Sequence, residues 1–243
     1  NMSIPAAAAQ ASWTASGAAP LPTATARAFE RKFGAILYNF YGATETGLVT
    51  LALPGEHTAR PGTIGRALFG NDILLVGEDG QEAAPGAPGE IFVRNSMLVR
   101  GYFRDAAATR AALRDGYFSV GDVAHCDADG YYYLDARKRD MIISGGVNIY
   151  PLEIEQCLLE HPAIVDAAVV GVPDEKWGEA VKAFVVKKDG VRMSEQDVCA
   201  HVRAHLADYK CPKHVQFLRE LPRNETGKIL KRELAAGEPP LSK

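Results

Sequence analysis

A long run of short β-rich segments, residues 61–138, is the feature that most constrains the fold of this chain. The run contains the stretches "DILLVGEDGQEAAPGAPGEIFVRNSMLVRGYF" and "DGYFSVGDVAHCDADGYYYLDARKRD", in which apolar residues alternate with turn-forming residues. This pattern is typical of strands joined by tight turns, so we expect a small antiparallel sheet or barrel. Asp127 and Asp129 lack the spacing of an EF-hand, and Asp-Gly between two strands favours a hairpin turn over a calcium loop.

The residues before this run predict the end of an α/β unit. "SWTASGAAP" (12–20) reads as a short strand followed by a loop of small residues. "TATARAFERKFG" (23–34) has helical spacing and ends at Gly34, a common helix stop. "AILYNFYG" then reads as a buried strand, and the order strand–helix–strand is typical of α/β proteins.

The residues after the run predict a compact α+β domain. "YPLEIEQCLLEHP" is a predicted helix with Pro151 in its first turn, where proline fits. "SEQDVCAHVRAHLADY" is a second predicted helix, with Ser194 and Asp197 as an N-cap pair. Predicted strands are "MIISGG", "VDAAVVGV", "AVKAFVV" and "HVQFL", and "ILKRELAA" is a short last helix. We place the domain boundary near Arg139, giving domains 1–138 and 139–243.

Composition narrows the class of protein. The 27 basic and 30 acidic residues give a net charge of −3, which does not favour nucleic acid as the main partner. The cysteines form no CxxC pair, which predicts reduced thiols and a cytoplasmic location: Cys126, Cys157, Cys199 and Cys211. No apolar run is long enough to cross a membrane, and "NMSIPAAAAQ" lacks the features of a signal peptide and does not resemble a natural N-terminus.

The stretch "YGATETG" (41–47) is the first candidate site. Its glycines, Gly42 and Gly47, predict a tight loop, since glycine tolerates backbone angles that other residues resist. Such a loop can aim the hydroxyl of Thr44 and the carboxylate of Glu45 at one ligand. A hydroxyl beside a carboxylate suits a phosphate oxygen next to Mg²⁺. The alternative is a polar turn after a strand.

Two further patterns have a chemical and a structural interpretation. His201 and His205 have a metal-ligand spacing on a predicted helix, but they lie beside an apolar stripe and lack an obvious third ligand, so we favour a structural role. "TGK" (226–228) is similar to the end of a Walker A loop, but position 222 is Pro where that loop needs Gly. Lys228 is therefore either a mobile positive charge on a glycine-ended loop or an ordinary surface lysine.

Five motifs together are more specific than any one of them: "SGAAP", "YGATETG", "YFSVGD", "LDARKRDMIISGGVNIYPLEIE" and "NETGK", in that order. With them the chain strongly resembles the adenylate-forming superfamily of acyl- and aryl-CoA synthetases, luciferases and peptide-synthetase adenylation domains. The resemblance runs from about Ser12 to about Leu234. It implies an α/β and α+β fold: the C-terminal, β-rich part of the large AMP-binding N-domain, followed by a small, mobile α+β domain that carries the catalytic lysine.

The resemblance also implies that part of the enzyme lies outside this sequence. Family members are usually about twice as long, and their N-terminal half carries a Ser/Thr/Gly-rich phosphate loop that ends in Pro-Lys-Gly. This sequence holds no such stretch. We therefore expect the C-terminal half of such an enzyme, inactive alone, whose partner is the missing N-terminal half, lost by cleavage or present on another chain.

The family resemblance assigns roles to the nucleotide-binding residues. Tyr41 would cover one face of adenine and Asn39 would contact the edge of the ring. Thr44 would contact the α-phosphate of ATP and Glu45 would bind Mg²⁺. Small residues would let the backbone approach the other face of adenine: Gly17, Ala18, Ala19 and Pro20. Two further residues would hold the ribose: Asp122 and Arg137. From the residues alone, without the resemblance, we would favour Asp122 as a loop aspartate that caps a turn.

The resemblance implies two half-reactions. A carboxylate attacks the α-phosphorus of ATP with Lys228 as the stabilising cation, and pyrophosphate leaves. The small domain then rotates about a hinge at Arg139, where Asp or Lys is more usual, and CoA takes the acyl group. A pantetheine tunnel would be lined by Ser144, Gly145 and Gly146, and further CoA contacts would come from Trp177, Tyr209, Lys210 and Lys213. Val147 stands where many relatives have Glu and is left unassigned.

Three functions remain open at this point. The first is an acyl-CoA ligase for a fatty or aryl acid. The second is an adenylation enzyme that loads a carrier protein, since the segments around Trp177 and Tyr209 occur in both groups. The third is an inactive nucleotide-binding or interaction module. The specific acid and the oligomeric state are not readable from the sequence.

Overall fold

The chain divides into two compact units. The computed structural model describes residues 12–17, 19–225 and 227–237, and the division falls between Lys138 and Arg139. The division lies within a 3₁₀ turn, η2 (Lys138–Asp140). Each unit contains one sheet, and the described helices are short, none of them long and apolar enough to cross a bilayer.

The first unit begins with the predicted strand–helix–strand order. Strand β1 (Thr14–Ser16) pairs in parallel with β2 (Leu37–Ala43), and helix α1 (Thr23–Phe33) connects them. The helix ends at Gly34, whose φ of 84° is one that glycine adopts without strain. This confirms the α/β prediction for this segment.

The rest of the first unit is antiparallel, as the β-rich run predicted. Its strands are β3 (Gly47–Ala52), β4 (Thr63–Ala67), β5 (Asp72–Val76), β6 (Gly89–Arg94), β7 (Leu113–Arg114), β8 (Tyr117–Cys126) and β9 (Tyr132–Arg137). Two short helices, α2 (Glu56–Ala59) and α3 (Ala106–Ala112), lie in the connections. Among described residues the strands form one nine-stranded sheet in the order β1-β2-β3-β4-β9-β8-β6-β5, with β7 on β8.

The predicted hairpin turn joins β8 to β9. The amide of Gly130 donates to the Asp127 carbonyl, which closes a tight turn. The carboxylates of Asp127 and Asp129 both pair with the guanidinium of Arg60. The turn is as predicted, and the ion pairs of both aspartates with Arg60 are an additional finding.

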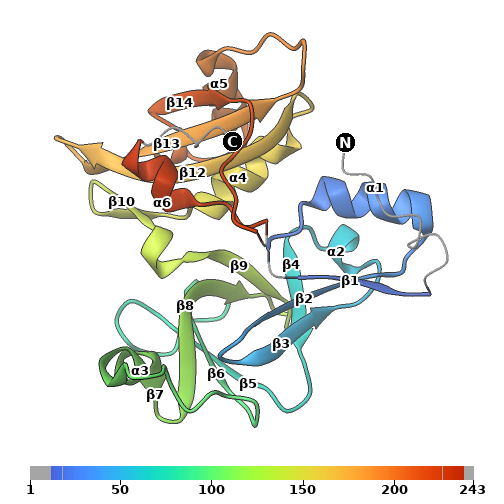
Figure 1. Ribbon diagram of the computed structural model, residues 1–243, viewed down its shortest axis with the longest axis vertical. Coiled ribbons are helices and arrows are strands. Elements are labelled where there is room, and N and C mark those ends of the chain that lie inside the picture. The colour runs from blue at the N-terminus through green and yellow to red at the C-terminus, as the bar shows by residue number, and fades with distance from the viewer. Residues whose placement is uncertain (1–11, 18, 226, 238–243) are drawn as a thin grey trace. The chain divides into compact units, whose positions relative to one another are not determined.

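The second unit is an α+β domain with helices on both faces of a sheet (Figure 1). Its strands are β10 (Ile142–Ser144), β11 (Val147–Ile149), β12 (Ile164–Asp174), β13 (Gly178–Lys187) and β14 (His214–Leu218). Its helices are α4 (Pro151–Glu160), α5 (Glu195–His205), the 3₁₀ turn η3 (Asp208–Lys210) and α6 (Lys231–Ala236). The described strands are ordered β11-β10-β13-β12, and β14 pairs with β13 in parallel.

Successive side chains of β12 point to opposite faces of the sheet and contribute to two hydrophobic cores of the second unit. Ala167 and Val169 face α4 and α5 on one side of the sheet. Ala168 and Val170 face Leu234 of α6 on the other side. The predicted start signals act as expected: Pro151 is the first residue of α4, and α5 begins with a capping box formed by residues 194 and 197.

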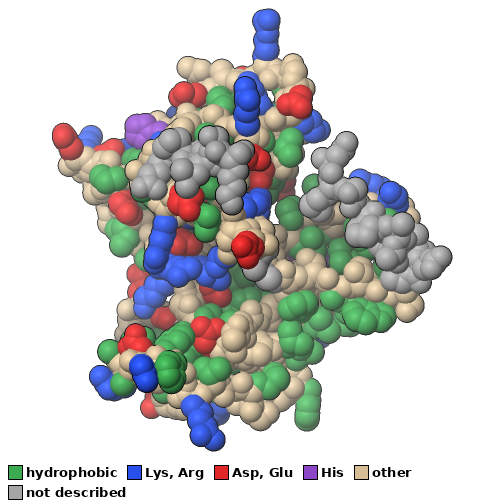
Figure 2. All heavy atoms as spheres, viewed as in Figure 1, with side chains coloured by type: hydrophobic (Ala, Val, Ile, Leu, Met, Phe, Trp, Pro, Cys, Tyr) green, Lys and Arg blue, Asp and Glu red, His purple; other side chains and the backbone are tan. Residues whose placement is uncertain are grey.

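The surface of the first unit carries exposed hydrophobic side chains. Leu48, Leu53, Phe69 and Met97 are each at least 47% exposed, and Phe69 is fully exposed. Figure 2 shows hydrophobic side chains gathered on this face, over the region of β3. Contiguous exposed apolar surface of this kind marks contact with another polypeptide or a ligand.

Candidate functional site

The motif at 41–47 forms the turn between β2 and β3. Thr44, Glu45 and Thr46 occupy the turn, and the Thr46 amide donates to the Ala43 carbonyl at 3.2 Å. A Cβ on Gly42 would lie 2.1 Å from the carbonyl oxygen of Gly47, so only glycine permits this approach. The predicted tight loop is confirmed.

The turn presents its two candidate residues differently. The side chain of Thr44 is exposed, whereas Glu45 is half-buried and its Oε1 accepts a hydrogen bond from the Tyr102 hydroxyl at 3.2 Å. Burial and the nearby Glu45 charge raise the pKa of Tyr102, so this hydroxyl stays a donor at neutral pH. The Glu45 carbonyl also accepts from the Val99 amide at 3.0 Å, which fixes the turn to the segment after β6.

Asp122 and Arg137 meet as direct partners across β8 and β9. Arg137 Nε lies 3.2 Å from Asp122 Oδ1, and the Tyr41 hydroxyl donates to Asp122 Oδ2 at 2.9 Å. The Asp122 side chain is 6% exposed and the Arg137 side chain 37% exposed, so the cation is the accessible end of the group. Burial, followed by the Asp122 charge, raises the pKa of Tyr41 well above its usual value. The structure thus brings three predicted nucleotide-binding residues together.

Asn39 lies on β2 opposite Ser16, the last residue of β1, and the predicted adenine loop follows β1. Asn39 is buried and its Nδ2 donates to the Thr63 carbonyl at 3.2 Å, so in this structure its amide joins β2 to β4. A Cβ on Gly17 would lie 2.3 Å from the ring of Phe40, so the small residue at 17 admits that ring. Ala19 and Pro20 are exposed, and Ala18 lies outside the described residues.

In the second unit, Ser144, Gly145 and Gly146 form the hairpin between β10 and β11. The two glycines have φ of 59° and 79°, which suits a two-residue hairpin loop. The Gly145 amide donates to the Trp177 carbonyl at 2.8 Å, and a Cβ on Gly145 would lie 2.7 Å from the indole ring. The indole, 43% exposed, therefore lies directly against the glycine turn.

Asp174 organises the surroundings of this indole. Its carboxylate accepts from the amides of Lys176 and Trp177, and from Lys213 Nζ at 3.1 Å. Lys213 Nζ also lies 5.4 Å from the centre of the indole ring, a cation–π distance. The hydrogen bond from Lys213 is the main cause of the lowered pKa of Asp174.

The other predicted CoA-binding residues lie on η3. Tyr209 is 54% exposed. Lys210 Nζ forms an ion pair with Glu153 of α4, and its side chain is only 17% exposed. Both candidate lysines, Lys210 and Lys213, are therefore held by carboxylates in this structure.

Lys228 lies on a turn that Asn224 holds closed. The Asn224 side chain accepts from the Lys228 amide at 2.9 Å, and the Asn224 amide donates to the Lys228 carbonyl at 3.0 Å. Gly227 has a φ of 83°, which only glycine adopts freely. Lys228 is half-buried at this turn, and Thr226 lies outside the described residues.

Comparison with known proteins identifies the family. Residues 5–103 match the family described as AMP-binding enzyme, and residues 153–228 match the AMP-binding enzyme C-terminal domain. The chain belongs to the adenylate-forming superfamily.

Several adenylate-forming relatives are CoA ligases by name. The chain is 42% identical over 224 residues to a long-chain-fatty-acid–CoA ligase of Bacillus subtilis, covering 92% of this chain and 40% of that protein. It is 43% identical over 216 residues to an indoleacetate–CoA ligase of Aromatoleum aromaticum, covering 88% and 42%. The chain thus spans about two-fifths of the length of these relatives.

Solved adenylate-forming structures share the fold. ATP-bound MatB from Rhodopseudomonas palustris matches with a TM-score of 0.86 and 36% identity, covering 93% of this chain and 45% of that chain. The amide bond synthetase McbA from Marinactinospora thermotolerans matches with a TM-score of 0.88 and 35% identity, covering 94% and 47%. These likenesses confirm the predicted fold class.

Three residues that sequence reasoning did not single out support the adenylate-forming motifs. Tyr102 donates to Glu45, Asp174 orients Trp177, and Asn224 closes the turn of Lys228. Asn224 and Asp174 each lie within four residues of the group they hold, so a search for side-chain-capped turns could have found them. Tyr102 lies 57 residues from Glu45 and has no comparable local signal.

The predicted hinge residue has a modest local contact. Arg139 lies within η2, and its Nε is 3.7 Å from the Asp140 carboxylate. An exposed pair at this distance contributes little to stability. The role of Arg139 as a hinge stays a prediction, as do the substrate contacts of all the residues above.

Proposed function

We propose that this chain carries the nucleotide-binding and mobile catalytic parts of an acyl-CoA ligase. The reaction joins a fatty or aryl acid to CoA through an acyl-adenylate and converts ATP to AMP and pyrophosphate. The observation that carries the proposal is the Tyr41–Asp122–Arg137 group, in the same unit as the turn that presents Thr44 and Glu45. The names of the relatives support CoA as the acceptor and span fatty and aryl acids.

In this proposal the Asp122–Arg137 pair binds the nucleotide ribose. A carboxylate can accept both hydroxyl protons of a ribose, and the Arg137 guanidinium orients that carboxylate through a contact of 3.2 Å. The Tyr41 hydroxyl donates to Asp122, so the ring cannot move to another χ1 rotamer without breaking a buried hydrogen bond. The pair therefore offers a preorganised contact for the sugar.

Thr44 and Glu45 act at the phosphates in this proposal. Oxygen ligands suit Mg²⁺, and the Tyr102 hydrogen bond engages only Oε1 of Glu45, so the residues fit such an ion. Mg²⁺ bound by Glu45 would offset phosphate charge. Lys228 supplies the positive charge during attack of the substrate carboxylate, and its movement away about Arg139 then admits the CoA thiol past Gly145 and Gly146.

We also propose that activity requires a further polypeptide that supplies the phosphate loop. The chain spans 40% and 42% of the two CoA ligases described above. The exposed hydrophobic side chains of the first unit offer a surface on which such a polypeptide can pack. The intact mass of the native protein tests this, with a value near twice 26.2 kDa expected.

Pyrophosphate exchange tests the adenylation step. The native enzyme is incubated with ATP, labelled pyrophosphate and a panel of fatty and aryl acids, and label should enter ATP only with its own acid. CoA is then added, and acyl-CoA should form. Transfer to a carrier protein but not to CoA would favour the carrier-loading alternative, and absence of exchange with every acid would favour the inactive module.

A further inference from the structure

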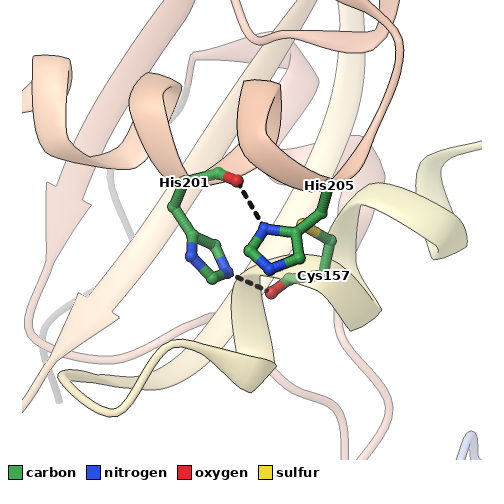
Figure 3. Close-up of side chains that lie close together, drawn as sticks. All are labelled: Cys157, His201 and His205. Atoms are coloured by element: carbon green, nitrogen blue, oxygen red, sulfur yellow. Dashed lines mark hydrogen bonds between the residues drawn. The ribbon is translucent and has the colours of Figure 1, made fainter.

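Three potential metal ligands of the second unit gather between α4 and α5. Cys157 lies on α4, and His201 and His205 lie one turn apart on α5. One ligand atom from each residue lies within 4.8 Å of the other two (Figure 3). The packing of the helices therefore provides the third ligand that the histidine spacing alone lacked.

Backbone carbonyls orient both imidazole rings. His205 Nδ1 lies 2.8 Å from the His201 carbonyl oxygen, and His201 Nε2 lies 2.8 Å from the Cys157 carbonyl oxygen. A carbonyl only accepts, so the neutral His205 ring carries its proton on Nδ1 and a lone pair on Nε2. Histidines that bind metals have this arrangement, with the second nitrogen donating to a carbonyl or carboxylate.

Neighbouring side chains contact His201 and affect the Cys157 thiol. The His161 ring packs edge-on against the His201 ring at 4.9 Å between centres, and the His161 Nδ1 accepts from the Ala163 amide at 3.1 Å. Burial, followed by the charges of Glu160 and Glu153, raises the pKa of the Cys157 thiol to about 11, so the free thiol stays protonated at neutral pH. Metal binding must therefore displace this proton.

We propose that Cys157, His201 and His205 bind one zinc-class divalent ion, which joins α4 to α5. A thiol and two imidazoles suit Zn²⁺ and not Mg²⁺. Tetrahedral Zn²⁺ with these ligands needs ligand atoms about 3.3 to 3.6 Å apart, so the cluster must close by little more than about 1 Å. Side-chain rotation provides this, because His205 is exposed and free to adjust.

Metal binding exchanges specific bonds at this cluster. The Cys157 thiol loses its proton to solvent and forms a sulfur–metal bond. His205 binds through Nε2 and keeps its hydrogen bond to the His201 carbonyl. The neutral His201 ring carries its proton on Nε2, against the Cys157 carbonyl, so it must shift that proton to Nδ1 by exchange with solvent. Its Nε2 lone pair then leaves the carbonyl and binds the metal, and water completes the tetrahedron.

Cobalt titration of the full chain, free of any histidine tag, tests the site. Co²⁺ replaces Zn²⁺ in tetrahedral sites, and a thiolate ligand adds a charge-transfer band in the near ultraviolet. We expect this band to saturate at one equivalent of Co²⁺ and to be lost on addition of Zn²⁺. The midpoint of thermal unfolding should rise with Co²⁺ concentration, because the ion binds the folded state.

Matched variants locate the ligands. Cys157→Ser should abolish the band, whereas Cys199→Ser on α5 should retain it. His205→Gln should weaken Co²⁺ binding at least about tenfold, whereas His214→Gln on β14, also an exposed histidine, should not. His205→Gln removes an exposed side chain, so it tests the site even if the buried Cys157→Ser variant fails to fold.

Three outcomes would overturn the proposal. The first is the absence of a thiolate–cobalt band from the wild-type chain at saturating Co²⁺. The second is a band that survives Cys157→Ser or is lost in Cys199→Ser. The third is equal Co²⁺ affinity of the His205→Gln and His214→Gln variants.

Discussion

The buried pair of Glu155 and Lys231 leads to the most quantitative expectation for the second unit. Glu155 Oε1 accepts from the Val169 amide at 2.7 Å and from Lys231 Nζ at 2.6 Å. The Glu155 side chain is 10% exposed and the Lys231 side chain 22% exposed. The pair ties α4 to the first residue of α6, which begins three residues after Lys228.

Replacing Lys231 by Met keeps most of the aliphatic stem but leaves a buried carboxylate without its cation. Breaking a buried pair in this way costs about 3–5 kcal/mol. The carboxyl group of Glu155 can avoid this penalty by taking up a proton. Protonation at pH 7 of a group with the ordinary glutamate pKa of 4.5 costs about 3.4 kcal/mol, because each of the 2.5 pH units costs about 1.36 kcal/mol. The free energy of unfolding should therefore fall by about 3 kcal/mol at pH 7.

The same reasoning predicts the pH dependence. Burial raises the pKa of Glu155, while Lys231 and the Val169 amide lower it, so removal of Lys231 raises it further. A carboxyl whose folded-state pKa lies above its unfolded value contributes full stability below the unfolded value and loses it as the pH rises through the folded value. Protonation of Glu155 costs only about 0.7 kcal/mol at pH 5. The loss in free energy of unfolding caused by Lys231→Met should therefore shrink to less than about 1 kcal/mol at that pH.

Urea unfolding at pH 5 and pH 7 provides the measurement. The sequence has two tryptophans, so a Trp13→Phe background leaves Trp177 as the reporter of the second unit. Lys188→Met, at an exposed lysine of the same unit, is the control and should change stability by less than about 0.5 kcal/mol. A Lys231→Met deficit of the same size at both pH values would refute the reasoning.

Three further expectations concern the proposed site. Gly145→Ala and Gly146→Ala both place alanine at positive φ, which costs about 1–2 kcal/mol each. Only the Cβ at position 145 meets Trp177, so Gly145→Ala should lower stability more in urea unfolding and should slow transfer to CoA. Equal effects of the two variants would contradict the indole contact. Lys228→Ala in the full enzyme should abolish pyrophosphate exchange and spare acyl transfer from supplied acyl-adenylate to CoA, so equal loss of both steps would argue against its assigned role. Asp122→Asn should lower kcat/KM for ATP about 10- to 100-fold, because it removes a charge-assisted hydrogen bond. An unchanged kcat/KM would count against ribose binding by Asp122.

Local signals in the sequence predicted the elements well. Gly34 ends α1, Pro151 begins α4, and Ser194 caps α5, because each of these residues acts on the backbone within one turn. The two glycines of the 41–47 motif likewise act across a single hairpin, so the turn could be expected from seven residues.

Contacts between distant segments could not be predicted in this way. Tyr102 reaches Glu45 and Lys231 reaches Glu155 only because separate strands and helices pack together. The same holds for Cys157, which joins two histidines that lie on a different helix. Asp122 and Arg137 were paired only through the family resemblance, and the register of β8 and β9 supplies the physical reason for their proximity.

Asp174 couples two side chains at the surface of the second unit, the indole of Trp177 and the ammonium of Lys213. One carboxylate fixes the backbone beneath the indole and restrains the ammonium of Lys213. Homologues that exchange this aspartate would be expected to alter the aromatic and the basic partner together. Replacement of Asp174 alone should therefore disturb the Trp177 turn and the Lys213 ammonium together.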